Sequence, residues 1–274
     1  MGLTQLNVWL DVVFTSLYVI ILIALSCHFI GNILTGRAKR RFGRQWDWPH
    51  HDSHPPFLPK FLHFLHVFSM IMLAVTGLLI RFPQFNRTPV RWAHYVFMLI
   101  VIVNLIWRLW YAFASRQRDY REFAVTKRDI TTAPKVILYY IFIKPSKPHL
   151  GKYNVMQKGT YILFVPLLIV QAITGLALWR MPLPIVATSL YDLAAGLIGA
   201  EGVYWVRTTH YIVNWLFIIL TTIHVYLSVT EDFPAFLDFF GLSAFGRKVA
   251  HTDDDEHGGD GHEPAPSYAS AEHA

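Results

Sequence analysis

Residues 207–231 read RTTHYIVNWLFIILTTIHVYLSVTE, with no formally charged side chain between Arg207 and Glu231. A helix that crosses the hydrocarbon core of a bilayer needs about 20 mostly apolar residues. This stretch therefore predicts a transmembrane helix over residues 208–230. Two histidines, His210 and His224, lie within it, one near each end.

Four more apolar runs precede this one, and together they predict the fold class. The third run contains Arg108, whose long side chain is expected to reach the headgroups near the end of the span. The first run has neither a basic N-terminal region nor a small-residue cleavage site, so we predict a retained span rather than a signal peptide. We expect an all-α integral membrane protein with five transmembrane helices, at residues 12–36, 61–80, 92–115, 159–179 and 208–230.

The composition agrees with this fold class and excludes several kinds of site. Of the 274 residues, 54% are hydrophobic and 15% are charged, against about 25% charged residues in a typical soluble domain. The single cysteine, Cys27, excludes a disulfide scaffold, structural Cys-ligated zinc and a Cys-held iron–sulfur cluster. Covalent c-type haem is excluded too, because no Cys-x-x-Cys-His motif occurs.

The distribution of Lys and Arg predicts the orientation, because cytoplasmic loops are enriched in both. Segments 37–60 and 108–158, together with Arg247 and Lys248, hold nineteen of the 24 basic residues. The opposite side holds five: Arg81, Arg87, Arg91, Arg180 and Arg207. We therefore expect a multi-pass protein of the inner (cytoplasmic) membrane, with the N-terminus outside and the C-terminus in the cytoplasm.

Histidines inside the spans are the strongest functional signal, since polar groups at membrane depth are costly and usually functional. His210 and His224 are separated by about 21 Å and almost four helical turns, so they lie on one helix face at opposite depths. His94 lies in the first turn of the third span, on the outer side. His63 and His66 lie in the first turns of the second span, on the cytoplasmic side.

Because two axial ligands hold a six-coordinate haem iron, each histidine of the last span needs a partner at its own depth. Depth pairs His94 with His210 outside, and His63 or His66 with His224 inside. This arrangement predicts two bis-histidine haem b groups stacked across the bilayer. For a single histidine, the alternative is an interhelical hydrogen bond or an interfacial anchor. His28, near the cytoplasmic end of the first span, is either interfacial or a ligand of a third haem with His66.

Small and basic residues near the outer histidines add to this prediction. Gly77 and Gly175 each end a Thr-Gly pair at a similar outer depth, where a glycine lets a bulky ring or another helix approach the backbone closely. Ordinary small-residue helix packing is the alternative. Arg91 and Arg207 precede the outer histidines by one turn and are candidate partners of haem propionates, or else interact with lipid headgroups.

Over residues 60–232 the sequence resembles the b-type cytochrome subunit of membrane-bound nickel–iron hydrogenases and the related gamma subunits of formate dehydrogenases. Three groups of residues carry the resemblance. The second span has His63-Phe64 fourteen residues before Gly77, which makes His63 a better match than His66. The third runs from His94 to the stretch Asn104-Leu105-Ile106-Trp107-Arg108-Leu109-Trp110-Tyr111-Ala112-Phe113. The last contains Val206-Arg207-Thr208-Thr209-His210, Trp215, His224-Val225-Tyr226 and Glu231-Asp232.

The resemblance implies a dihaem cytochrome b that carries electrons between a partner redox enzyme and the membrane quinone pool. The partners would be an iron–sulfur electron-transfer subunit and a catalytic subunit, and the exchangeable substrate would be menaquinone or ubiquinone. His66 and Asn154 are candidates for the quinone site; no catalytic acid, base or nucleophile is predicted. The expected organisation is an additional helix (1–36), a basic loop (37–59), a four-helix dihaem domain (60–250) and an acidic tail with histidines (251–274).

Two features depart from the family pattern. The first helix has no counterpart in the usual four-helix core, and Tyr211 stands where the family often has a second histidine.

Alternative functions predict other sequence features. A proton-relaying transporter predicts carboxylates within the spans, and the sequence places none there. A haem-free anchor gives no reason for histidines matched by depth. A cytochrome b that oxidises quinol for an external reductase or multihaem cytochrome fits the same residues.

Overall fold

The computed structural model describes residues 3–43, 48, 57–81, 86–116, 118–146, 155–183 and 187–242. These residues form helices and connecting segments without a β-strand. In chain order the elements are α1 (Leu3–Leu34), α2 (Arg37–Phe42), α3 (Phe57–Arg81), α4 (Arg87–Phe113), the 3-10 helix η1 (Asp119–Phe123), α5 (Lys127–Tyr140), α6 (Val155–Ala177), α7 (Leu190–Glu231) and α8 (Phe233–Phe239).

The prediction of five membrane spans is confirmed, because α1, α3, α4, α6 and α7 are long and apolar enough to cross a bilayer. The largest difference from the predicted bounds is in α7, which begins eighteen residues before the predicted span. A break at Gly199, where φ is 69°, separates the first part of α7 from the part that contains the predicted span. That backbone conformation favours glycine, which has no Cβ.

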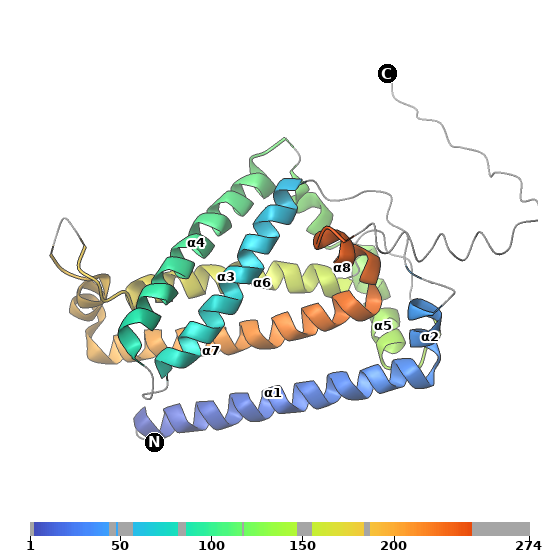
Figure 1. Cartoon of the computed structure of the whole chain (residues 1–274), viewed down its shortest axis with the longest axis horizontal. Helices are drawn as coiled ribbons and strands as arrows, with labels where there is room; N and C mark the ends of the chain where they lie inside the picture. The colour runs from blue at the N-terminus through green and yellow to red at the C-terminus, as the bar shows by residue number, and fades with distance from the viewer. Residues whose placement is uncertain are drawn as a thin grey trace, which may run out of the picture.

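The helices α3, α4, α6 and α7 form the bundle that positions the histidines. α6 and α7 run side by side along the molecule, and the hairpin of α3 and α4 packs across them at an angle (Figure 1). The centre of the bundle is a cluster of buried apolar side chains from α4, α6 and α7: Val101, Leu105, Leu168, Val213 and Phe217. The histidines lie on either side of this apolar layer along α7.

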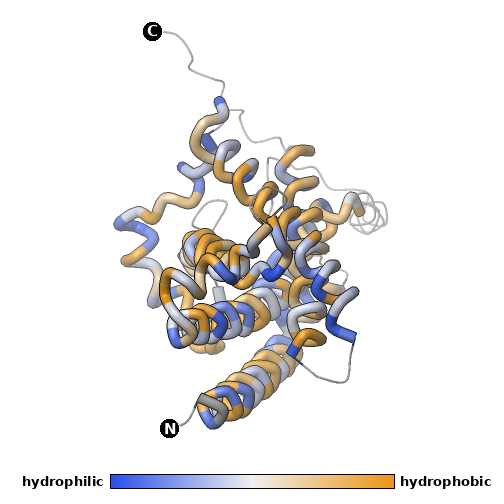
Figure 2. Tube along the Cα trace, turned by 90° about the vertical axis from the view of Figure 1, so that its left-hand side faces the viewer, coloured by the Kyte–Doolittle hydropathy of each residue, from blue (hydrophilic) through white to orange (hydrophobic). Residues whose placement is uncertain are grey.

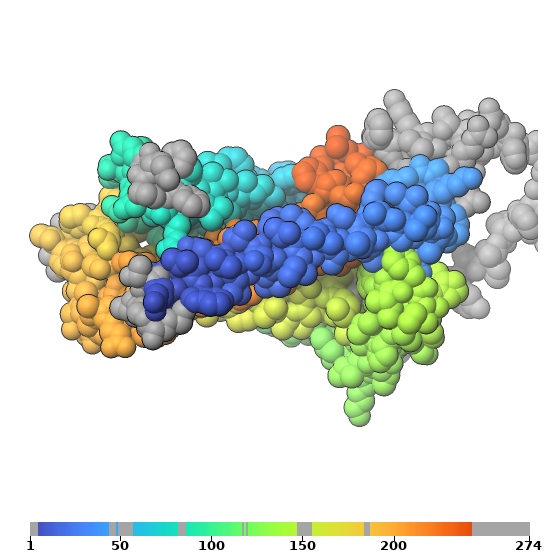
Figure 3. Space-filling view, turned by 90° about the horizontal axis from the view of Figure 1, so that it is seen from below, coloured from blue at the N-terminus to red at the C-terminus, as the bar shows by residue number. Residues whose placement is uncertain are grey.

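The additional helix α1 packs along α7, on one side of the bundle (Figures 2 and 3). Near the end of the bundle that the basic residues predict to face outward, called the outer end below, Asp11 accepts hydrogen bonds from Arg81 of α3, at 2.5 Å, and from the hydroxyl of Tyr211. Farther along, Phe14 stacks on Trp215, with ring centroids 6.0 Å apart. α1 is therefore held by specific side-chain contacts, although most of its surface faces outward.

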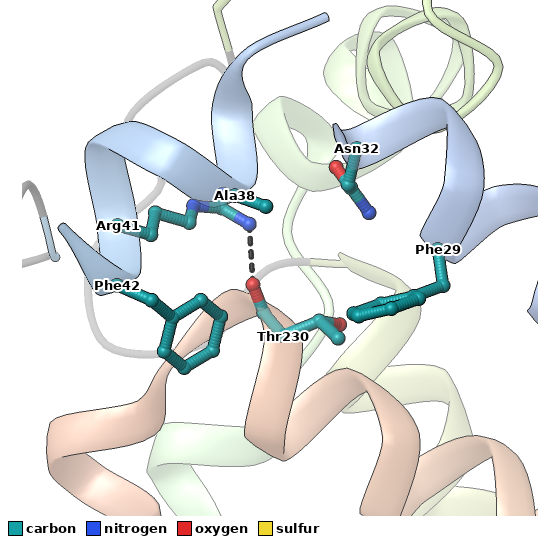
Figure 4. A pocket seen from close by; sticks show the side chains of 6 residues that line it. All are labelled: Phe29, Asn32, Ala38, Arg41, Phe42 and Thr230. Carbon is teal, nitrogen blue, oxygen red and sulfur yellow. Dashed lines mark hydrogen bonds between the residues drawn. The ribbon is translucent and has the colours of Figure 1, made fainter. Parts of the chain in front are cut away.

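At the other end, α1 and α2 are tied to the last turn of α7. Arg41 of α2 donates two hydrogen bonds to the buried carboxylate of Glu231, at 2.8 and 3.1 Å, and a third to the carbonyl of Thr230. Figure 4 shows Arg41 and Thr230 beside a small cavity that Asn32 also lines. Buried ion pairs with several hydrogen bonds fix the relative placement of the elements they join.

The short helix α5 begins with a capping box, and the carboxylate of this box also joins the helix to the same end of the bundle. Asp129 accepts hydrogen bonds from the backbone N–H and the hydroxyl of Thr126, both at 2.8 Å, and Thr126 in turn accepts from the Asp129 N–H. The same carboxylate accepts from Lys158 at the start of α6, at 2.9 Å. These bonds hold the pKa of Asp129 well below its usual value, at about 2.

We expect Asp129→Asn to lower the midpoint of thermal unfolding by a few degrees, because it weakens a helix cap and leaves the Lys158 ammonium without its carboxylate. Thermal unfolding of the detergent-solubilised protein measures the loss. Asp192→Asn is the matched control, since Asp192 caps α7 with Ser189 in the same way and has no lysine bond. Its loss should be the smaller one; equal losses would contradict the role given to Lys158.

The same pair predicts a pH dependence. The pKa of Asp129 is lowered in the folded protein, so its stabilising contribution is complete above the ordinary value of 3.8 and disappears as the pH falls towards 2. The stability difference between the wild type and Asp129→Asn should therefore shrink across this interval. A difference that stays constant from pH 6 to pH 2 would contradict the assignment.

Candidate functional site

The two outer histidines come together from different helices. His94 of α4 and His210 of α7 have ring centroids 6.4 Å apart and an interplanar angle of 68°. Bonds from a transition metal to imidazole nitrogens are about 2 Å long, so two imidazoles on opposite sides of one metal have centroids roughly 6 Å apart. The spacing of His94 and His210 therefore fits a single metal ion between the rings.

Two threonines set which nitrogen of each outer histidine carries the proton. Thr76 Oγ1 lies 2.8 Å from Nδ1 of His94, and Thr174 Oγ1 lies 2.9 Å from Nδ1 of His210. Each hydroxyl already donates to a carbonyl one turn earlier, Met72 or Val170, so it accepts from the histidine N–H. The Nε2 atoms of His94 and His210 are then unprotonated, which is the tautomer that a metal ligand requires.

The glycine after each threonine makes room for the imidazole. A Cβ atom at Gly77 would lie 3.5 Å from Cε1 of His94, and a Cβ at Gly175 would lie 3.3 Å from Cε1 of His210 and 3.2 Å from the sulfur of Met98. The contact at Gly175 is tighter than ordinary van der Waals packing. The bulky rings that approach these glycines are thus the histidine side chains themselves.

Gln171 of α6 is a further residue of the outer site, and the sequence pattern did not single it out. Its Nε2 lies 3.2 Å from Nε2 of His210. Its Oε1 is buried and has no hydrogen-bond partner among the described residues. A buried polar atom without a partner is uncommon and calls for an explanation such as an absent ligand. The outer site therefore has the features of a place built for an additional polar or metal-containing group.

The inner histidines are less closely assembled. His63 of α3 and His224 of α7 are near enough for their charges to interact, as are His63 and His66. The ring of His63 packs on Phe239 of α8 at 4.9 Å, and the ring of His224 lies 5.9 Å from Tyr161 of α6. The structure thus brings the three histidines to one end of the bundle, with aromatic side chains against two of them.

The chemistry of these pairs fits a haem better than a bare metal ion. No group of three or more His, Cys, Asp or Glu side chains suited to a metal occurs in the described ranges. A metal held at either pair therefore has two histidine ligands and takes the others from water or a cofactor. A haem supplies four nitrogens from its porphyrin and leaves two axial positions for histidine.

The remaining candidates lie apart from the paired rings. His28 contacts Tyr226 of α7 through Nδ1 at 2.6 Å and Asn32 at 3.2 Å, in an interface of α1 that does not include His66. Arg91 is half-buried and Arg207 is exposed, while Arg81 pairs with Asp11. Asn154 and the acidic tail at 251–274 lie outside the described residues.

Comparison with known proteins adds the family. Residues 54–240 match the family model described as prokaryotic cytochrome b561. A protein of Rhizobium leguminosarum bv. viciae, named as a probable Ni/Fe-hydrogenase B-type cytochrome subunit, is 25% identical over 196 residues, which are 62% of this chain and 77% of that protein. The protein of the same name from Rhodobacter capsulatus is 24% identical over 188 residues, covering 62% and 71%. Helices α1 and α2 precede the matched region.

The threonine bonds give a test of metal ligation at the outer site. We expect Thr76→Val and Thr174→Val each to weaken retention of haem at this site by about 10- to 100-fold, because the hydrogen bond that orients the ligand is lost. Haem transfer to an excess of apomyoglobin measures retention. Thr160→Val is the control, since the Thr160 hydroxyl is exposed and donates to the Met156 carbonyl of its own helix. Equal transfer rates for all three variants would contradict this role.

Proposed function

Since this chain belongs to the prokaryotic cytochrome b561 family, we propose that it carries electrons between a partner redox enzyme and the membrane quinone pool through two haem b groups. The family membership and the five spans make the chain a multi-pass b-type cytochrome that takes part in electron transfer. The observation that carries the finer proposal is the matched pair of Thr–His hydrogen bonds on α3–α4 and α6–α7. These bonds leave Nε2 of both outer histidines ready for a metal.

In this proposal His94 and His210 hold the outer haem iron, and His63 and His224 hold the inner one. Haem iron supplies one-electron chemistry by alternating between the ferric and ferrous states. Thr76 and Thr174 keep the outer imidazoles in one tautomer and orientation. The Gln171 amide, 3.2 Å from Nε2 of His210, would have to give up this contact for Nε2 to hold iron. The apolar cluster of Val101, Leu105, Leu168, Val213 and Phe217 excludes water from the bundle between the two sites.

Quinone exchange is proposed at the inner end, where His66 lies one turn from His63. The paired histidines account for His63 and His224 and leave His66 for another role. Asn154 remains a proposed second contact. With the basic segments on the cytoplasmic side, protons for quinone reduction would come from the cytoplasm, and the N-terminus would lie outside.

The partner is proposed to be a hydrogenase-like enzyme with an iron–sulfur subunit, placed at the outer end of the bundle. The names of the relatives support this choice, since they describe cytochrome subunits of Ni/Fe hydrogenases. Arg91 and Arg207 remain proposed partners of haem propionates at this end. Neither makes an ion pair within the described part of the chain.

Haem counts in single variants test the pairing. We expect two haem b per wild-type chain, and one in each of His94→Ala, His210→Ala, His63→Ala and His224→Ala, because each substitution removes one axial ligand. The pyridine haemochrome assay on purified protein gives the number. His66→Ala and His28→Ala are the controls and should keep two. A full complement in any of the four ligand variants would refute the pairing, and a wild type without haem would refute the function.

A kinetic experiment tests the quinone site separately. We expect His66→Leu to raise the quinol concentration for half-maximal haem reduction about tenfold, the effect of losing one hydrogen bond to the quinone. Stopped-flow reduction of the haems by a soluble menaquinol analogue measures this concentration. His28→Leu is the matched control, because His28 is a half-buried histidine near the same end. An unchanged value for His66→Leu, with both haems present, would exclude this residue from the site.

A further inference from the structure

Helix α5 has three stripes of different character along its length, because positions three and four apart share a helix face. The first is the buried or half-buried stripe that packs on the bundle: Asp129, Thr132, Val136 and Tyr139. The second is apolar and exposed: Ile130, Pro134, Ile137 and Ile141. The third is exposed and basic or polar: Arg128, Thr131 and Lys135, with Lys127 beside it at the start of the helix.

The exposed apolar stripe is large for so short a helix. Ile130, Ile137 and Ile141 expose 63%, 47% and 55% of their surface. The adjoining Lys127, Arg128 and Lys135 make no ion pair within the described part of the chain. Water solvates the basic stripe well but the apolar stripe poorly. The arrangement therefore indicates an environment that is apolar beside the isoleucines and anionic beside the basic residues.

The place of α5 in the molecule supplies such a surrounding. The helix connects the end of α4 to the start of α6 and lies near α2 at the basic end of the bundle (Figure 1). There its atoms stand out beyond those of the neighbouring spans (Figure 3). A segment that joins two membrane spans at this point lies at the boundary between hydrocarbon and headgroups.

We propose that α5 is a membrane-surface helix that binds anionic phospholipid. Its isoleucines enter the acyl region, and Lys127, Arg128 and Lys135 contact the lipid phosphates. A helix with an apolar face beside a basic one is the form that binds an anionic bilayer surface. Every charged side chain in the exposed stripes is positive, so the surface complements anionic lipid along its whole length.

The helix is anchored firmly enough to act as a fixed lipid site. Asp129 is bonded to Lys158 of α6, and the hydroxyl of Tyr139 accepts a hydrogen bond from Arg41 of α2 at 2.6 Å. Arg37 donates to the carbonyls of Tyr139 and Lys144 near the end of α5, at 3.0 and 2.7 Å. Lipid bound on α5 is thereby connected to α6 and α7, the helices that carry Tyr161 and His224.

Spin labels on the reconstituted full-length protein test the seating of α5. In a Cys27→Ser background, a label at Ile137→Cys should be accessible to oxygen, which concentrates in hydrocarbon, and protected from a water-soluble nickel chelate. A label at Thr131→Cys, on the basic stripe, should be the more accessible to the chelate. Equal access of the chelate to both positions in vesicles of phosphatidylglycerol and phosphatidylcholine would overturn the proposal.

Charge variants test the preference for anionic lipid. We expect Lys127→Gln, Arg128→Gln and Lys135→Gln, combined in one chain, to weaken binding of phosphatidylglycerol by about fivefold per charge removed. Native mass spectrometry of the haem-loaded protein titrated with phosphatidylglycerol gives the affinity. The matched control is Lys39→Gln with Arg40→Gln, which removes exposed charges from α2 at the same end. An equal loss per charge in the control would overturn the proposal, as would displacement of the lipid by millimolar inorganic phosphate.

Discussion

A histidine within a membrane span has two ring nitrogens, and each needs a partner because lipid offers none. At the outer site this constraint is met on one side by Thr76 and Thr174, which accept the Nδ1 protons of His94 and His210. Nε2 of each ring is then left to bind a different group. The glycine after each threonine permits the close helix approach that these bonds require. The packing of α3 on α4 and of α6 on α7 in the outer half of the bundle thus keeps two imidazoles in one orientation.

The same constraint explains how α1 is held. Apolar burial does not attract one membrane helix to another, because lipid tails are as apolar as leucine; packing and hydrogen bonds do so instead. The contacts of α1 are of that kind: Asp11 with Tyr211 near the outer end, Tyr18 with Thr222 at 3.2 Å near the middle, and His28 with Tyr226 near the other end. Tyr211 thereby has a role in binding the additional helix. All three contacts lie on α7 within two residues of a proposed haem ligand, Tyr211 beside His210 and the other two beside His224, so α1 helps to set the position of both ligands.

Hydropathy and histidine spacing predicted the features that depend on local sequence. The five spans follow from uninterrupted apolar runs, and the pairing of His94 with His210 follows from depth alone; the structure places their rings close together. The role of Gln171 depends on how α6 turns against α7, which no local pattern specifies. The extension of α7 before residue 208 was missed because charged residues such as Glu201 and Arg207 interrupt its hydropathy. Helix α5 was missed because charged and apolar residues alternate on three faces, and this pattern becomes clear only once the buried face is known.

The two ends of the bundle differ in the side chains around their histidines, and this difference supports the proposal that quinone exchanges at the inner end. The outer site is closed by threonine and glycine packing, and the rings of its two histidines lie next to each other. The inner histidines instead lie against Phe239 and Tyr161, near α8 and the basic elements α2 and α5. Aromatic side chains pack well on flat ring systems, and the same end of the bundle adjoins the lipid surface. These contacts support the proposal that a flat, lipid-soluble substrate exchanges at the inner end, beside the proposed inner haem, while the outer pair holds a cofactor that does not exchange.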